Sequence, residues 1–221
     1  MTVDISEKLV RIPAGMVKLE GSLAVPDGAS GVVLFAHGSG SSRHSPRNRF
    51  VAEALQKQGV ATLLIDLLTT KEDVNYETRF DIGLLTSRLE AATTWLVERP
   101  EVRNLTIGYF GASTGAAAAL QAAASFGSEI GAVVSRGGRP DLVLEVLNRV
   151  RAPTLLIVGG RDDVVIELNQ RAYERLGAEK KLVIVPGATH LFEEPGALEE
   201  VARLASDWFK KHLRLKHQRD G

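Results

Sequence analysis

The stretch that decides the fold is LTIGYF-GASTG-AAAALQAAA, residues 105–124. Its apolar run Leu105–Phe110 is typical of a buried strand, and its Ala-rich run Ala116–Ala124 is typical of a helix. Between them, Gly111–Gly115 fits the pattern G-x-S-x-G in the strand-turn-helix context that this pattern requires. A turn this sharp strains the backbone of Ser113, exposes its hydroxyl and leaves free N–H groups at the start of the helix.

The residues on either side of this stretch repeat the same strand-then-helix order. Short apolar runs predict further strands at Gly31–Ala36, Val60–Leu68, Ala132–Ser135, Thr154–Val158 and Leu182–Val185. Longer amphipathic runs predict helices at Phe50–Gln58, Phe80–Val97, Ile166–Leu176 and Leu198–Leu213. Because the strands are continuously apolar, both faces of the sheet are covered, which is typical of a mostly parallel α/β sheet.

Local patterns predict the structure of three further segments. Met16–Pro26 alternates apolar and polar residues around Gly21, which predicts an antiparallel hairpin at a sheet edge. Lys71–Thr78 is polar and predicts a loop, whereas Asp141–Val146 is long enough for one or two helical turns. The interval Arg136–Ala152 is too short for a separate cap, so we expect an open or shallowly covered site.

Length, charge and cysteine content limit the class of protein. The chain has 221 residues without a linker or repeat, which predicts one α/β domain over residues 1–221. Its 27 basic and 27 acidic residues give no indication of nucleic-acid binding. No leader or bilayer-length apolar run is visible, so we expect a cytoplasmic protein that does not bind membranes. The lack of Cys excludes disulfides, Cys-ligated zinc and a Cys nucleophile.

Polar, Gly-rich loops follow four of the predicted strands. They are HGSG at 37–40, GASTG at 111–115, GGRDD at 159–163 and PGATH at 186–190. Ligands of open parallel sheets bind beyond the carboxyl ends of the strands, so we expect these loops to converge at one edge.

Three of these loops hold the residue types of a nucleophilic triad. Ser113 is a weak nucleophile without a base, and His190 is the histidine whose position after a strand suits that role. Asp162 follows its strand sooner than Asp163, so we prefer it as the carboxylate that orients His190, with Asp163 left as the alternative. His212 and His217 are interpreted as solvated surface residues.

The loop at 37–40 is a candidate for binding a negatively charged intermediate. The N–H groups of Thr114 and Ser39 are the expected oxyanion donors, with Gly40 as an alternative to Ser39. His37 is expected to hold the loop by hydrogen bonds rather than to transfer protons.

Several arginines fall in loops at the same edge and could bind a substrate anion. Gly40, Arg43 and Arg136 are the candidate substrate-binding residues, and Arg47, Arg139 and Arg161 lie in the same group of loops. Solvated loop charge is the alternative interpretation. We expect Asp66, late in its strand, to hold the Arg43–Asn48 loop in place.

With these motifs and the chain order Ser113, Asp162, His190, the sequence resembles the α/β-hydrolase superfamily over nearly its whole length. The small size and the loops HGSG, GASTG, GGRDD and GATH resemble the dienelactone-hydrolase-like esterase branch. The resemblance implies an α/β-hydrolase fold, with a mostly parallel sheet of about eight strands, and ester hydrolysis through an acyl-enzyme. Classical dienelactone hydrolases use a Cys nucleophile, whereas Ser113 occupies that place here.

The sequence-based hypothesis is therefore a serine carboxylesterase that acts on a small-molecule ester, as a monomer or homodimer, without metal or cofactor. Thioesters and lactones would use the same residues and stay open as substrates. The alternatives are a non-catalytic binding module on a hydrolase fold, or an acyltransferase or perhydrolase with the same triad.

Overall fold

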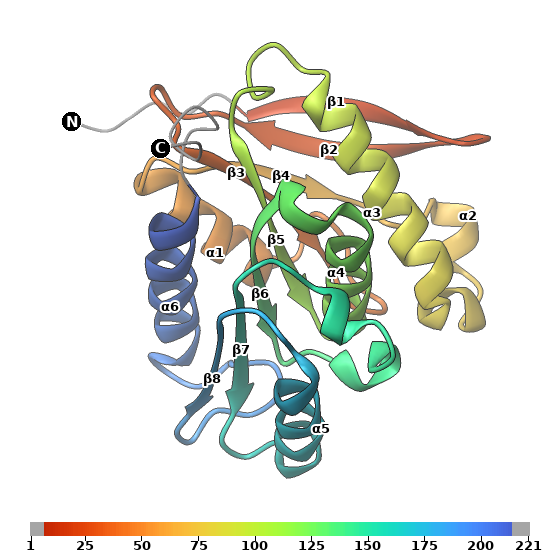
Figure 1. Cartoon of the computed structure of the whole chain (residues 1–221). Coiled ribbons are helices and arrows are strands. Elements are labelled where there is room, and N and C mark those ends of the chain that lie inside the picture. The colour runs from red at the N-terminus through yellow and green to blue at the C-terminus, as the bar shows by residue number, and fades with distance from the viewer. Residues whose placement is uncertain (1–6, 214–221) are drawn as a thin grey trace.

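An eight-stranded sheet forms the centre of the computed structural model, which describes residues 7–213 (Figure 1). The strand order is β1-β2-β4-β3-β5-β6-β7-β8; β1 and β2 pair antiparallel, β2 pairs antiparallel with β4, and the remaining neighbours are parallel. The strands are β1 Glu7–Ala14, β2 Val17–Ala24, β3 Gly31–Ala36, β4 Ala61–Ile65, β5 Thr106–Ala112, β6 Ile130–Arg136, β7 Thr154–Gly159 and β8 Lys180–Val185. The α/β-hydrolase expectation, with a mostly parallel sheet of eight strands, is confirmed.

Helices cover both faces of the sheet (Figure 1). One face carries α1 (Pro46–Lys57) and α6 (Ala197–His212), and the other carries α3 (Ile82–Val97), α4 (Thr114–Phe126) and α5 (Asp163–Arg175). The buried apolar side chains accordingly form two clusters, one on each side of the sheet. Successive residues of β3 alternate between these clusters because side chains of a strand point to opposite faces.

The N-terminal hairpin does not lie where the sequence predicts it. The turn connects Ala14 to Val17 through Gly15, whose φ is 65°, and Met16. Gly21 instead lies inside β2, where an added methyl group would be 3.1 Å from the Val10 side chain. Gly21 therefore serves close packing between strands and not a turn, so the hairpin prediction is wrong in register.

The segment predicted as a loop at 71–78 contains helical structure. A short helix α2 (Thr70–Asp73) begins with a capping box, in which Thr69 accepts from the Glu72 N–H and Glu72 accepts from the Thr69 N–H. A 3₁₀ turn, η1 (Glu77–Phe80), follows it. Beyond β6, two further 3₁₀ turns, η3 (Pro140–Val143) and η4 (Leu147–Arg149), replace the helical turns predicted at 141–146. The other predicted elements exist, with ends shifted by a few residues.

Within residues 7–213, no helix is long and apolar enough to cross a membrane.

Candidate active site

The turn between β5 and α4 places Ser113 at the carboxyl edge of the sheet, near its centre. Ser113 has φ 52° and ψ −122°, a conformation that non-glycine residues rarely adopt. A methyl group added at Gly115 would lie 2.2 Å from the Ala36 carbonyl oxygen, and one at Gly111 would lie 2.4 Å from the Ala116 Cα. Gly115 thus allows α4 to approach β3 closely, and Gly111 allows the end of β5 to approach the start of α4.

The base and the carboxylate of the predicted triad are in direct contact. His190 Nδ1 lies 2.6 Å from Asp162 Oδ2, a short distance typical of a charge-assisted hydrogen bond. Asp162 has a mostly buried side chain, 17 % exposed, whereas His190 is 39 % exposed and open to a ligand. Asp163 is exposed and begins α5, so the structure gives His190 the partner that the sequence favours.

The end of β6 and the residues that follow it contact both Ser113 and His190. The Ser113 N–H donates to the Arg136 carbonyl, and the Arg139 N–H donates to the Ser113 carbonyl. A methyl group at Gly137 would lie 3.4 Å from His190 Nδ1. Residues 136–139 therefore contact Ser113 on one side and the His190 ring on the other.

A buried asparagine that the sequence analysis does not identify anchors this segment. Asn169, on α5, is fully buried and donates from Nδ2 to the Gly138 carbonyl at 3.0 Å and to the Val165 carbonyl at 2.8 Å. An asparagine on the inward face of an otherwise apolar helix surface is the sequence signal that could reveal this role.

The loop after β3 contacts the nucleophile turn, but one predicted donor already has an acceptor. The Ser39 N–H donates to Thr114 Oγ1 at 3.1 Å, so in this structure it does not point freely at a ligand. Gly38 lies against Ser113, because a methyl group there would be 3.0 Å from the Ser113 Cβ. Thr114 is the first residue of α4, where helix N–H groups lack a helical acceptor.

His37 holds this loop in the way that the sequence analysis expects. Its Nε2 accepts from the Leu67 N–H at 3.0 Å, so the proton lies on Nδ1, which donates to the Gly38 carbonyl at 2.9 Å. Burial lowers the pKa of His37, which keeps the ring neutral and suited to both bonds.

The predicted arginines take three different positions. The guanidinium of Arg43 pairs with Asp66 and with Glu20 of β2, which gives it a structural role, and its contact with substrate stays a prediction. The Arg43 N–H also donates to Asp66 at 2.7 Å, which confirms that Asp66 holds this loop. Arg139 pairs with Asp141 through two hydrogen bonds of 2.9 Å. Arg136 is buried at the end of β6.

Two other predictions concern histidines away from this edge. His212 is mostly buried and packs on Trp208 with ring centroids 4.6 Å apart, so its interpretation as a solvated residue is wrong. His217 lies outside the described residues.

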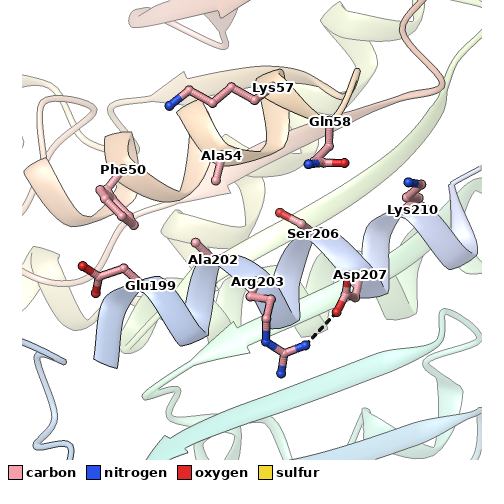
Figure 2. Close-up of a pocket in the computed structure, with 10 residues that line it drawn as sticks. All are labelled: Phe50, Ala54, Lys57, Gln58, Glu199, Ala202, Arg203, Ser206, Asp207 and Lys210. Carbon is pink, nitrogen blue, oxygen red and sulfur yellow. Dashed lines mark hydrogen bonds and ion pairs between the residues drawn. The ribbon is translucent and has the colours of Figure 1, made fainter. Parts of the chain in front are cut away.

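A groove of about 360 Å³ lies between α1 and α6 (Figure 2). Lysines, an arginine and carboxylates line it, and Arg203 already bonds Asp207 across one turn of α6. None of the predicted site residues lines it. In the described part of the chain, no group of three or more His, Asp or Glu side chains could hold a metal ion. The edge at Ser113 is therefore the better candidate for a chemical site.

The sheet order, the strained serine turn and the loops around it define an α/β-hydrolase. Residues 19–217 match the Dienelactone hydrolase family, and the chain belongs to that family of hydrolases. The crystal structure of a dienelactone hydrolase from Anabaena variabilis is 60 % identical, with a TM-score of 0.93 over 95 % of this chain and 99 % of that one. Est1E from Butyrivibrio proteoclasticus shares the fold at 18 % identity, with a TM-score of 0.79 over 92 % of this chain and 98 % of that one.

Curated relatives from Mycobacterium tuberculosis are longer than this chain. A protein named "Putative phosphoribosyl transferase", found under that name in two strains, is 60 % identical over 204 residues. The match covers 92 % of this chain and 46 % of the relative, so the chain spans about half of that protein's length.

Proposed function

We propose that this hydrolase is a serine carboxylesterase with Ser113, His190 and Asp162 as its catalytic residues. The observation that carries the proposal is the 2.6 Å contact between His190 Nδ1 and Asp162 Oδ2. Residues 136 and 137 connect it to a strained strand-to-helix turn, because the Arg136 carbonyl accepts from the Ser113 N–H and Gly137 lies against the His190 ring. Nδ1 is engaged by Asp162, which leaves Nε2 of His190 to take the proton from the Ser113 hydroxyl.

The reaction follows from these positions. Ser113 Oγ attacks the carbonyl carbon of the ester while its proton moves to His190 Nε2, and Asp162 stabilises the resulting imidazolium. His190 then gives the proton to the leaving alcohol as the C–O bond breaks, which leaves an acyl group on Ser113. A water molecule, deprotonated by His190, attacks the acyl carbon, and Ser113 regains its proton as the acid leaves.

The developing oxyanion needs fixed donors. The Thr114 N–H, at the start of α4, is the first donor in this proposal. The second is the Ser39 N–H, which must exchange Thr114 Oγ1 for the oxyanion when substrate binds. The N–H of Gly40 is the alternative, as in the sequence analysis.

The longer mycobacterial relatives do not alter this proposal. The part that they share with this chain covers most of the region that matches the hydrolase family. We therefore propose ester hydrolysis for this chain, with thioesters and lactones as substrates of the same triad, and assign it no phosphoribosyl transfer.

The test is hydrolysis of p-nitrophenyl acetate, butyrate and octanoate by the native protein, Ser113→Ala and Ser125→Ala. Ser125 is an exposed serine on α4 that bonds only within its helix, so it is a matched control. We expect turnover to disappear in Ser113→Ala and to persist in Ser125→Ala. Equal turnover in all three proteins would refute Ser113 as the nucleophile.

A fluorophosphonate probe separates the remaining alternatives. Labelling of the native protein but not of Ser113→Ala, without ester turnover, would indicate a reactive serine with another acyl substrate. Neither labelling nor turnover would favour the non-catalytic binding module.

A further inference from the structure

Two polar side chains at the start and in the middle of α5 are connected to His190 by different routes. Asp162, the residue that precedes α5, contacts His190 Nδ1 directly at 2.6 Å. Asn169 lies two turns further on, about 10 Å along the helix axis, and its Nδ2 donates to the Gly138 carbonyl at 3.0 Å. Gly137 lies against the His190 ring, because a methyl group there would be 3.4 Å from both Nδ1 and Cε1. The contacts therefore form a closed ring, from α5 through Asp162 to His190 and back through Gly137 and Gly138 to α5.

Gly138 lies between α4 and α5. A methyl group at Gly138 would be 2.7 Å from the Cβ of Ala116, which belongs to the first turn of α4, directly after Ser113. The Gly138 carbonyl bonds the other helix, through the amide of Asn169. A shift of this peptide would thus move the segment that contacts both Ser113 and His190.

Asn169 is an expensive choice for a residue that only stabilises the fold. Its side chain is fully buried, and although Nδ2 has two acceptors, Oδ1 is buried without a hydrogen-bond partner. A buried acceptor without a partner costs roughly as much as one or two buried hydrogen bonds contribute. The second acceptor, the Val165 carbonyl one turn earlier in α5, fixes the orientation of the amide. The arrangement therefore favours exact placement of Gly138 over stability.

We propose that Asn169 is a positioning residue of the triad: its bond to Gly138 keeps Gly137 against the His190 ring, so that the ring stays in line with Asp162. This inference rests on the proposed function and adds a residue that touches neither substrate nor reacting atoms. Catalytic side chains need such supporting contacts, because a small misplacement of the base slows the reaction strongly. The competing explanation is that Asn169 only satisfies a buried carbonyl.

The first test measures kcat and KM for p-nitrophenyl butyrate in the native protein, Asn169→Leu and Thr93→Val. Leucine has nearly the size of asparagine but no amide. Thr93 is the matched control, because it is a buried polar residue whose hydroxyl donates to the Leu89 carbonyl and bonds the Tyr109 hydroxyl. None of these bonds involves a residue of the candidate site, so Thr93→Val removes buried hydrogen bonds without touching the triad.

We expect kcat to fall about 10- to 100-fold in Asn169→Leu while KM stays within about twofold, because a misplaced base slows the chemical step and leaves binding unchanged. In Thr93→Val both constants should stay within about twofold of the native values. A native kcat in Asn169→Leu, or a change confined to KM, would overturn the proposal. An equal fall of kcat in both variants would also overturn it, because a general loosening of the core would then explain the result.

The second test does not depend on turnover. Nitrogen-15 NMR in mildly alkaline buffer reports which ring nitrogen of His190 carries the proton, and the His190 signals are identified by their loss in His190→Gln. The proton should lie on Nδ1 in the native protein and in Thr93→Val, because Asp162 accepts it. In Asn169→Leu we expect a mixture of both tautomers. An unchanged spectrum in Asn169→Leu, or a mixture already in the native protein, would overturn the proposal.

The two tests together separate this inference from the proposed function. If the native protein cleaves no ester but Asn169→Leu mixes the tautomers, the positioning role stands and the esterase proposal fails. If Ser113→Ala abolishes turnover but Asn169→Leu keeps the native kcat, the esterase proposal stands and the positioning role fails.

A second variant applies if Asn169→Leu does not fold. The hydroxyl of Asn169→Ser can still bond the Val165 carbonyl one turn earlier, but it is too short to reach Gly138. A fall of about tenfold or more in kcat with an unchanged KM would support the proposal, and a native kcat would overturn it.

Discussion

Replacing Asp162 by Asn tests the role of the carboxylate at His190 without changing the shape of the side chain. Asp162 precedes α5 but makes no capping hydrogen bond with its side chain, so the helix should not depend on its charge. The matched control is Asp163→Asn, one residue further on, where the carboxylate is exposed. Both variants remove one negative charge from the same turn.

The size of the expected effect follows from the contact between the two side chains. In the proposed mechanism His190 becomes an imidazolium, and its ring nitrogen lies 2.6 Å from the Asp162 oxygen. Two unit charges about 4 Å apart attract by about 4 kcal/mol at an effective dielectric constant of about 20. At about 1.4 kcal/mol for each factor of ten, this corresponds to a loss of about 10³-fold in kcat. Because His190 is 39 % exposed, solvent screening reduces the loss toward about 10²-fold.

The assay is kcat for p-nitrophenyl butyrate, together with thermal unfolding as a check that each variant is folded. We expect a loss of about 10²- to 10³-fold in Asp162→Asn, and of less than about threefold in Asp163→Asn, as for an exposed charge. A larger loss in Asp163→Asn than in Asp162→Asn would refute the reasoning and move the acid role by one residue.

Three further predictions concern stability. In Gly115→Ala the new methyl group would be 2.2 Å from a backbone carbonyl oxygen. We expect the free energy of unfolding to fall by about 2–3 kcal/mol and the melting midpoint by roughly 5–10 °C. In the helical control Gly83→Ala the free energy should change by less than about 1 kcal/mol, and equal midpoints in the two variants would contradict the close approach. The pKa of His37 is lowered in the folded state, so below about pH 6.5 the unfolded state takes up the proton first. The free energy of unfolding should therefore fall with acidification, by at most about 1.4 kcal/mol per pH unit. Urea unfolding across this range should show a flatter pH slope in His37→Asn, and an equal slope would exclude this histidine as the cause. Asp66→Asn weakens the contacts with Arg43. Denaturant unfolding should show a free energy of unfolding lower by about 1–2 kcal/mol, and an unchanged value would show that other contacts hold the Arg43–Asn48 loop.

The strand-helix alternation was predictable from the sequence because each strand of the parallel sheet is a short apolar run. The positions of Ser113, Asp162 and His190 at one edge follow from the same alternation. The capping box at Thr69 and Glu72 was also visible as T-x-x-E, and attention to it predicts α2 in place of a loop.

Other features depend on contacts that a sequence pattern does not contain. Gly21 is equally suited to a turn and to close strand packing, and only the neighbouring side chain of Val10 decides between them. The acceptor of the Ser39 N–H lies 75 residues away, on Thr114. The burial of Arg136 depends on α1 and on the loop after β8, so a charged residue at a strand end gives no sign of it.

The hydrogen bond between Ser39 and Thr114 has a consequence for the order in which the candidate site forms during folding. It joins loops 75 residues apart in the chain, and the contact of His190 with Asp162 spans a further 28. Parallel pairing of distant strands is slow, because the intervening chain must be ordered before the contacts stabilise it. The turn at Ser113, the nucleophile of the proposed mechanism, is therefore completed only when most of the sheet has formed.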